Sequence, residues 1–572
     1  MKMRASATIG SIAILALALA GCSGGSTANG GSSTSKADPY APLIVKDGFK
    51  DKGGNVNVLM SADFATLDPG NSNYVQTANV GQLYYRTLTM AKETAGQPPK
   101  IVPDLATDTG KASADGMSWT YTLKKGVKFE DGSPITSKDI KYGIERTYAR
   151  DVYTQAPQEL DSALADDGYK GPYQGGDLKS VETPDDSTIV FHLKQPNPDF
   201  PALASRSNSA PVPQAKDTKL DYTNHPVSSG PYKVKSYERG RQLVLERNPN
   251  WDASTDPNRS ALPDSFTFSL STSQSTISQQ LISNSDPTAI TLDSNGALQA
   301  SDTAKLNDAD VKSRLAGGFL GCIDIIAFNT QSVKDPDVRK ALSLAMDRNA
   351  MQVQYGGQRF GQIAQSQLTD KMAGYQAPVT DLDPSGKPKL DEAKKLLQGK
   401  TVPKTLSYGY ANSAPRYKNI GTVLQQNFKE LGIDLQLQPI PAANYYTTLA
   451  GDNMPDIARS GWCGGADSSS ARFTVDPGVG PSIDGKTWGF SNIPRFYDTT
   501  LSKEMFDLRS QNGSKDELGK KWFDVYNKAM EQTPLVPFVH SYTLSVVGSK
   551  IHNAQVGYFF GSIDLSEVGV EK

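Results

Sequence analysis

The fold of this chain is decided by one stretch of sequence: IVPDLA at residues 101–106, WTYTLKKGVKF at 119–129 and DGSPITSKDI at 131–140. The alternating aromatic and β-branched residues of 119–123 predict a strand. Asp131-Gly132 is a turn signal that separates this strand from a second element. Thr136 or Ser137 can cap a helix that has Asp139 in its first turn. Local patterns alone therefore predict a strand, a turn and a capped helix.

The order of these residues resembles the signature of the family 5 extracytoplasmic solute-binding proteins of peptide and nickel ABC importers. That pattern joins a P-x-L-A turn, an aromatic strand, the string L-[RK]-x-G-V-x-F-x-D-G-x-P-[IL]-T-x-x-D and a helix that ends in E-R. Further matches are FATLDP at 64–69, YYRTL at 84–88, SSGPYKV at 228–234, VLERNPNW at 244–251, IIAFNT at 325–330 and DVRKALSLAMDR at 337–348. Because the matches extend from about residue 56 to about residue 545, the resemblance covers nearly the whole folded chain.

The resemblance implies an α/β fold, a two-lobed periplasmic-binding-protein-like clamshell (type II) with an extra subdomain in the first lobe. A chain of 572 residues also exceeds a single hydrophobic core, which favours more than one lobe. The expected domains are a lipoprotein signal peptide at 1–21, an acylated cysteine and flexible Gly/Ser tether at 22–50, lobe I at 51–76, 226–321 and 541–572, an inserted subdomain of lobe I at 77–225, and lobe II at 322–540.

The N-terminus predicts the compartment of the protein. Lys2 and Arg4 precede an apolar run at 9–20 that is too short to span a bilayer comfortably. The run ends in LAGC at 19–22, which resembles the lipobox of bacterial lipoproteins and implies that Cys22 is acylated. A plain secretory signal or an uncleaved anchor is the alternative. We expect a lipid-anchored protein on the outer face of the bacterial cytoplasmic membrane, or in the periplasm where the host has an outer membrane.

Composition and motifs give little support for catalysis or for nucleic-acid binding. The formal charge is −2, from 59 basic and 61 acidic residues without a block of like charge, so no nucleic-acid partner is expected. The chain has neither an H-E-x-x-H motif nor a paired C-x-x-C, and its four histidines lack metal-ligand spacing: His192, His225, His540 and His552. The P-loop-like string GPSIDGKT at 480–487 lacks a preceding buried strand and a following helix, which predicts a loop. We therefore expect no enzyme activity, no metal and no cofactor.

The string DIARSGWCGGAD at 456–467 resembles the D-V-A-R-A-G-W-C-A-D cleft segment of oligopeptide-binding relatives. In those relatives an aspartate soon after the tryptophan pairs with the α-ammonium of the peptide, which is the natural role for a buried carboxylate. Carried over, the resemblance places Gly461 in the cleft, Trp462 in its wall and Asp467 at the ammonium. Because Gly464-Gly465 are inserted here, Asp467 lies two residues further from the tryptophan than the aspartate of the relatives does. It is therefore either the ammonium ligand or a loop residue.

The resemblance assigns five further residues to the cleft region. Arg459 pairs either with a peptide carboxylate or with a neighbouring acid. Asp63 and Ala65 align with the backbone that lines the cleft in the first lobe. Cys322 and Cys463 occupy positions at which some relatives carry a disulfide, and the alternative is a pair of buried free thiols.

We therefore predict a monomeric substrate-binding component of an ABC importer, which captures oligopeptides in an interlobe cleft and delivers them to a membrane permease. The same fold could instead bind a non-peptide solute such as a nickel chelate or an oligosaccharide, although the scarcity of histidine argues mildly against direct metal binding. A secreted hydrolase is the alternative from another class. It would need a nucleophile and a base in one cleft, and no motif supplies them.

Overall fold

The computed structural model describes residues 39–572, except for 73–74, 155, 166–167, 286, 288–290, 294–299, 413–414, 442–443, 466–467, 483 and 490. Pro39–Lys572 forms one compact unit. This unit contains three large sheets, each beside its own hydrophobic core, which we call lobe I, the inserted subdomain and lobe II. Among the described residues, no helix is both long enough and apolar enough to cross a bilayer.

Lobe I is built on a five-stranded sheet in the order β11-β1-β10-β9-β8. Strand β1 pairs in parallel with β10 and β11, whereas β10, β9 and β8 are antiparallel. Alternate side chains of a strand point to one face, and Val56, Val58, Phe266 and Phe268 are fully buried on this sheet. The elements are β1 (Asn55–Leu59), α1 (Val75–Tyr84), β8 (Tyr232–Glu238), β9 (Gln242–Arg247), β10 (Ser265–Ser269), α5 (Gln274–Ser283), β11 (Thr291–Asp293), α6 (Ala309–Ser313), β18 (Ile551–His552) and β19 (Gly569–Val570).

The inserted subdomain holds a four-stranded sheet in the order β4-β5-β7-β6 and a separate hairpin, β2-β3. The expected strand and capped helix are both confirmed, because β5 is followed by a helix with Thr136 as its N-cap. The Asp139 carboxylate accepts the Thr136 N–H at 2.8 Å, which satisfies a backbone group at the helix start. The elements are β2 (Thr89–Thr94), β3 (Gln97–Pro103), β4 (Lys111–Ala112), β5 (Ser118–Thr122), α2 (Ser137–Thr147), α3 (Glu159–Ala163), β6 (Val181–Asp185), β7 (Thr188–His192) and α4 (Phe200–Leu203).

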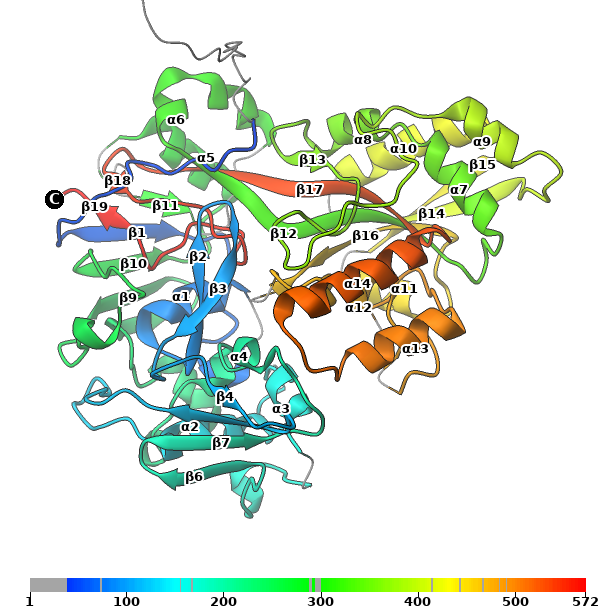
Figure 1. Ribbon diagram of the computed structural model, residues 1–572. Coiled ribbons are helices and arrows are strands. Elements are labelled where there is room, and N and C mark those ends of the chain that lie inside the picture. The colour runs from blue at the N-terminus through cyan, green and yellow to red at the C-terminus, as the bar shows by residue number, and fades with distance from the viewer. Residues whose placement is uncertain are drawn as a thin grey trace, which may run out of the picture. The chain divides into compact units, whose positions relative to one another are not determined.

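Lobe II is built on a six-stranded sheet in the order β13-β17-β12-β16-β14-β15. In the view of Figure 1, α7 to α10 lie above this sheet and α12 to α14 lie below it. The elements are β12 (Leu315–Phe328), α7 (Pro336–Ala345), α8 (Arg348–Tyr355), β13 (Gly361–Ile363), α9 (Leu390–Leu396), β14 (Thr405–Ala411), α10 (Pro415–Lys429), β15 (Asp434–Ile440), α11 (Tyr445–Ala450), β16 (Ile457–Cys463), α12 (Arg472–Val479), α13 (Thr499–Leu508), α14 (Lys515–Met530) and β17 (Leu535–Val546).

Two long strands, β12 and β17, connect lobe I with lobe II. They run side by side between the two lobes (Figure 1) and pair from Leu315 and Val546 at one end to Ala327 and Leu535 at the other. The pairing is interrupted between Phe319 and Ile323. The domain limits expected at 321/322 and 540/541 therefore fall inside these strands, because each strand contributes side chains to the cores of both lobes.

A buried group of four charged side chains joins the inserted subdomain to lobe I, and we call Arg86, Asp104, Asp256 and Arg259 the Asp104 cluster. Arg86 Nε donates to Asp104 at 2.7 Å, and Arg259 donates to both carboxylate oxygens of Asp104 at 3.0 and 2.9 Å. Arg259 also donates to Asp256 at 3.0 Å, and each of the four side chains is at most 2% exposed. Burial alone would raise the pKa of Asp104, but the two guanidinium groups outweigh it and hold that pKa below its usual range.

A second buried group, the Arg146 cluster of Asp68, Arg146, Tyr153 and Asp217, joins the same two parts. Arg146 donates to the two oxygens of Asp68 at 2.9 and 2.7 Å and to the Tyr153 hydroxyl at 2.8 Å. Asp217 approaches the same guanidinium at 3.2 Å. Asp68 belongs to the segment that follows β1, whereas Arg146 lies in the last turn of α2 of the subdomain. Asp104 of the decisive stretch and Arg146 of the helix that follows it thus attach the subdomain to lobe I.

Candidate functional site

A cavity of about 960 Å³ lies between the inserted subdomain, lobe II and the C-terminal segment. The subdomain contributes α3 and side chains within 194–206, and the C-terminal segment contributes 558–561. Lobe II contributes side chains of α12 and α13 together with 462–465, and β12 contributes 321–322. A volume near the upper end of the roughly 300–1,000 Å³ of ordinary ligand pockets suits a ligand of several linked units.

Aromatic side chains form much of the cavity wall, namely Trp462, Phe473, Phe506, Tyr558, Phe559 and Phe560. The indole of Trp462 is fixed from lobe II, because its Nε1 donates to the Phe473 carbonyl at 2.5 Å. Trp462 also packs against the hydrophobic core of lobe II while it lines the cavity. Rigid rings of this kind offer a ligand a large apolar contact area at a small cost in conformational entropy.

Three cations of the cavity wall are paired with acids of the protein: Arg206 with Glu159 at 3.1 Å, Arg472 with Asp199 at 3.2 Å and Arg509 with Asp476 at 2.7 Å. The Arg472–Asp199 pair differs from the other two because it connects α12 of lobe II to the residue that precedes α4 of the subdomain. The wall therefore presents mainly satisfied charges and aromatic faces to whatever enters the cavity.

Cys322 and Cys463 lie opposite each other on β12 and β16 and are joined by a disulfide, with their Cα atoms 4.0 Å apart. Both residues line the cavity. Gly461, two residues earlier on β16, faces the β12 backbone, where an added Cβ would come 3.1 Å from the Ile323 carbonyl oxygen. Glycine at this position therefore permits the close pairing of the two strands beside the disulfide.

Arg459 is bound to an acid of the protein in this structure. Its guanidinium forms an ion pair with Asp324 and lies 4.4 Å from the ring centroid of Tyr417. The second oxygen of Asp324 accepts the Tyr355 hydroxyl at 2.8 Å. Burial lowers the pKa of Arg459 to about 10, so the guanidinium stays charged at neutral pH. Arg459 is not among the described residues that line the cavity.

Asp63 and Ala65 lie beside the β8–β9 hairpin of lobe I and are not among the described lining residues of the cavity. The Asp63 carboxylate accepts the Tyr237 hydroxyl at 2.8 Å and the Gly240 N–H at 2.9 Å. The carbonyl of Ala65 accepts from Arg239 at 3.4 Å. In this structure both residues make contacts within lobe I.

Two residues singled out from the sequence, Cys22 and Asp467, lie outside the described residues. Gly464 and Gly465, which lead directly to Asp467, line the cavity. The role of Asp467 therefore stays a prediction, as does acylation of Cys22.

The C-terminal wall of the cavity is held by a carboxylate that the sequence analysis did not single out. Glu93 of β2 accepts the backbone N–H groups of Tyr558, Phe559 and Phe560 at 2.9, 2.8 and 3.2 Å. Burial and the nearby Asp564 carboxylate nevertheless raise the pKa of Glu93 to about 8. The aromatic triplet at 558–560 is a sequence signal that could have indicated this wall. No neighbouring sequence pattern indicates the role of Glu93, because Glu93 lies 465 residues before its partner Tyr558.

None of the four histidines is among the described residues that line the cavity. Burial lowers the pKa of His540 to about 4, which keeps it neutral, and His225 pairs with Glu130 at 2.9 Å. The described residues also contain no group of three side chains arranged to hold a metal ion.

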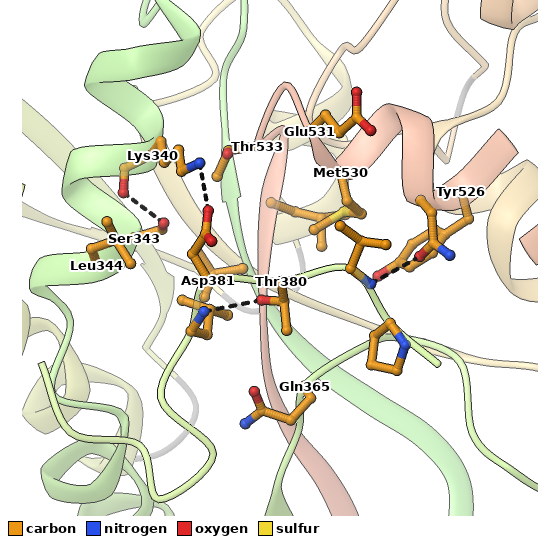
Figure 2. A pocket seen from close by; sticks show the side chains of 16 residues that line it. Lys340, Ser343, Leu344, Gln365, Thr380, Asp381, Tyr526, Met530, Glu531 and Thr533 are labelled. Atoms are coloured by element: carbon orange, nitrogen blue, oxygen red, sulfur yellow. Dashed lines mark hydrogen bonds and ion pairs between the residues drawn. The ribbon is translucent and has the colours of Figure 1, made fainter. Parts of the chain in front are cut away.

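A separate pocket of about 200 Å³ lies within lobe II and shares no lining residue with the cavity. Figure 2 shows Lys340 directed at Asp381, with which it forms an ion pair at 2.5 Å, and Thr380 on the same loop. This pocket is bounded by α7, α14 and the 378–382 loop. It is confined to one lobe, so domain closure cannot enclose a ligand there.

The family model of bacterial extracellular solute-binding proteins, family 5 middle, matches residues 100–477. The chain is 26% identical over 416 residues to the probable D,D-dipeptide-binding periplasmic protein of Escherichia coli (strain K12), covering 70% of this chain and 73% of that protein. It is also 26% identical over 428 residues to the periplasmic oligopeptide-binding protein of Salmonella typhimurium (strain LT2), with the same two coverages of 70% and 73%.

Among solved structures, the clavulanic acid biosynthesis oligopeptide binding protein 2 aligns with a TM-score of 0.83 and 28% identity. The alignment covers 94% of this chain and 98% of that protein. The expected fold class, an α/β periplasmic-binding-protein fold of type II, is thereby confirmed.

Proposed function

Because the chain belongs to the family 5 bacterial extracellular solute-binding proteins, we propose that it is the lipid-anchored substrate-binding component of an ABC importer and captures oligopeptides. The single observation that carries the proposal is the aromatic cavity of about 960 Å³ between parts of the molecule that β12 and β17 connect. Ligand that touches both sides of this cavity favours closure, and the closed form is then recognised by the permease.

A peptide is the ligand class that the chemistry of the cavity favours. Peptides carry one backbone whatever their sequence, and backbone groups of a cleft can bind them as an added strand. The glycines at 464–465 border the cavity, and neither carries a side chain of its own that would cover its backbone. The dipeptide- and oligopeptide-binding relatives support the same ligand class.

We assign the residues of the cleft as follows. Trp462 forms the lobe II wall against which the peptide packs, and Asp467 captures the peptide ammonium at the end of the glycine segment. A peptide carboxylate that reaches Arg459 must compete with Asp324 for the same guanidinium. Asp63 and Ala65 would contact ligand only beyond the cavity, near the β8–β9 hairpin.

The remaining parts of the proposal concern the anchor and the partners. Acylation of Cys22 would hold a monomer at the outer face of the bacterial cytoplasmic membrane. The tether expected at 22–50 would end before Leu43, because Leu43 and Val45 pair with Gly317 and Ala554 and Val45 is buried in the core of lobe I. Delivery then needs the permease subunits of the importer and no covalent chemistry in the cleft. The family consists of binding proteins, so we assign no enzyme activity to this chain.

The proposal is tested by calorimetric titration of residues 36–572 with a mixed tripeptide to pentapeptide pool, and with the same pool after N-acetylation. Binding that is lost on acetylation supports an ammonium-capturing acid, and the Asp467→Asn variant should then lose the same affinity. Equal binding of both pools keeps the peptide ligand and removes Asp467 from the site. No heat from either pool overturns the oligopeptide assignment.

A further inference from the structure

A side pocket of about 80 Å³ opens beside the main cavity, between α1 and the C-terminal loop at 557–561. The side pocket adjoins the cavity, because four residues line both spaces: Val75, Arg206, Phe559 and Phe560. One buried water needs roughly 10–15 Å³ by this kind of measure, so the pocket has room for several non-hydrogen atoms. That is the size of one branched or aromatic side chain.

The wall of the side pocket is rich in apolar groups, which are Val75, Ala78, Tyr85, Met90, Ala91, Pro157, Phe559 and Phe560. Ala78 lies on α1 and keeps the pocket open, because its side chain is a single methyl group. Tyr85 is 8% exposed, and an added Cβ at Gly81 would come 2.4 Å from its ring. The glycine of α1 thus makes the space that the tyrosine ring occupies at the edge of the pocket.

The charged and amide groups in this wall already have protein partners. Arg259 donates to Asp104 and Asp256 in the Asp104 cluster, and its Nε donates to the Gln82 carbonyl at 2.6 Å. The Gln82 amide donates to Asp564 at 3.2 Å. Arg206 is paired with Glu159 at 3.1 Å. A charged ligand group placed here would lose its water and gain a hydrogen bond to the Ser72 hydroxyl but no opposite charge, which is costly, whereas an apolar group avoids this cost.

The pocket is preformed on its C-terminal side. Glu93 holds the backbone of Phe559 and Phe560, so both rings are positioned before any ligand arrives. The opposite wall is α1, and the Asp104 cluster fixes Arg259 at its base. Because the walls are already in place, little conformational entropy is lost when a ligand binds. More of the free energy gained by burying apolar area therefore remains as binding affinity.

We propose that this side pocket binds one bulky apolar side chain of the peptide and makes the protein selective for peptides that carry a leucine-like or phenylalanine-like residue. The inference rests on the proposed peptide-binding function and adds the class of peptide to it. A charged side chain at the same position is selected against, since the charged groups of the wall are already paired and the unpaired Ser72 hydroxyl offers a hydrogen bond but no compensating charge.

The test is calorimetry with trialanine and with analogues that carry Leu, Phe, Asp or Lys at one position in turn. At one position, Leu or Phe should improve Kd about ten- to a hundredfold over Ala, the effect of burying one large apolar side chain. Asp and Lys at that position should bind no better than Ala.

A matched pair of variants locates the effect. Ala78→Leu fills the side pocket and should reduce the Leu-to-Ala ratio of affinities to near one. Ala163→Leu is the control, because Ala163 also lies on a helix and lines the main cavity but does not line the side pocket. It should leave the ratio as in the unaltered protein. Melting temperatures establish that both variants fold.

The outcomes separate the two proposals. If tripeptides bind but show no preference for Leu or Phe at any position, the proposed selectivity of the side pocket is wrong and the proposed peptide binding stands. If the Ala78→Leu protein folds and keeps the full preference for Leu or Phe over Ala, the side pocket is not the source of that preference and the inference is wrong. If no tripeptide binds, the proposed function fails and this inference fails with it.

Discussion

The inserted subdomain has two borders, and they are held in different ways. Toward lobe I it is joined by the Asp104 and Arg146 clusters, in which Arg86, Asp104 and Arg146 are at most 2% exposed and each makes several hydrogen bonds. Toward lobe II, the Arg472–Asp199 pair has side chains that are 17% and 11% exposed. Among the described residues, two hydrogen bonds accompany it, one of 3.4 Å from Asn512 to the Asp115 carbonyl and one from Lys371 to the Gly96 carbonyl of the β2-β3 hairpin.

This difference indicates which border opens. Breaking a buried, multiply bonded charge cluster leaves uncompensated charges in the interior, whereas a partly exposed pair exchanges its partner for water at little cost. The subdomain should therefore move with lobe I, and the cavity should open by motion of lobe II about β12 and β17. The pairing of these strands is irregular between Phe319 and Ile323 and again between Asp324 and Ile325, and backbone angles can change there.

The largest effect is expected from Asp104→Ala, which leaves the two buried guanidinium groups of Arg86 and Arg259 with Asp256 as the remaining carboxylate of their cluster. The free energy of unfolding should fall by about 3–5 kcal/mol in urea titrations. Asp186→Ala is the control, because it removes an exposed ion pair of the same subdomain, with Lys138 at 3.1 Å, and should cost less than about 1 kcal/mol. Equal losses in the two variants would mean that the border with lobe I is no firmer than an exposed pair.

The next effect concerns the disulfide on the lobe II side of the connecting strands. Replacing both Cys322 and Cys463 by Ser should lower the free energy of unfolding by about 2–4 kcal/mol, because the cross-link closes a loop of 141 residues in the unfolded chain. Denaturant titrations of the variant and of the unaltered protein, with and without a thiol reductant, measure it. Reductant should destabilise the unaltered protein and leave the variant unchanged; sensitivity of the variant to reductant would contradict the assignment.

Glu93 adds a pH-dependent contact on the lobe I side. Its pKa of about 8 in the folded state exceeds the ordinary value of 4.5, so between these values the folded protein binds more protons than the unfolded chain. Stability should therefore decrease as pH rises from about 5 to 8, by on the order of 2 kcal/mol from this group. Thermal melts across this range should show a smaller decrease for Glu93→Gln. An identical pH slope in the two proteins would remove Glu93 as the cause.

The smallest effect on stability is expected from Arg472→Gln at the border with lobe II. Loss of this partly exposed pair should change the free energy of unfolding by less than about 1 kcal/mol. The same variant should increase the radius of gyration of the ligand-free protein in small-angle X-ray scattering, since the pair holds the two sides of the cavity together. Lys138→Gln is the control for scattering. If Arg472→Gln strongly destabilises the protein and leaves its radius of gyration unchanged, the subdomain moves with lobe II and not with lobe I.

The sequence was sufficient for the family and the fold class, because the decisive stretch is a long ordered string. It did not show why that string carries its charges. Asp104 meets Arg259, which lies 155 residues later, and Arg146 meets Asp68, which lies 78 residues earlier, so no local pattern connects them. The identity of the acid beside Arg459 was likewise invisible, since Asp324 and Arg459 are 135 residues apart and meet only across paired strands.

The shared use of β17 has a consequence for how the protein is made. This strand begins at Leu535, and both the sheet of lobe II and the lobe I end of β12 require it. The core of lobe I also needs Ile563 and Val568 from the segment beyond it. A nascent chain that has been synthesised only as far as α14 therefore has two unfinished lobes and no complete one. The topology therefore requires the C-terminal residues of the chain before either lobe can finish folding.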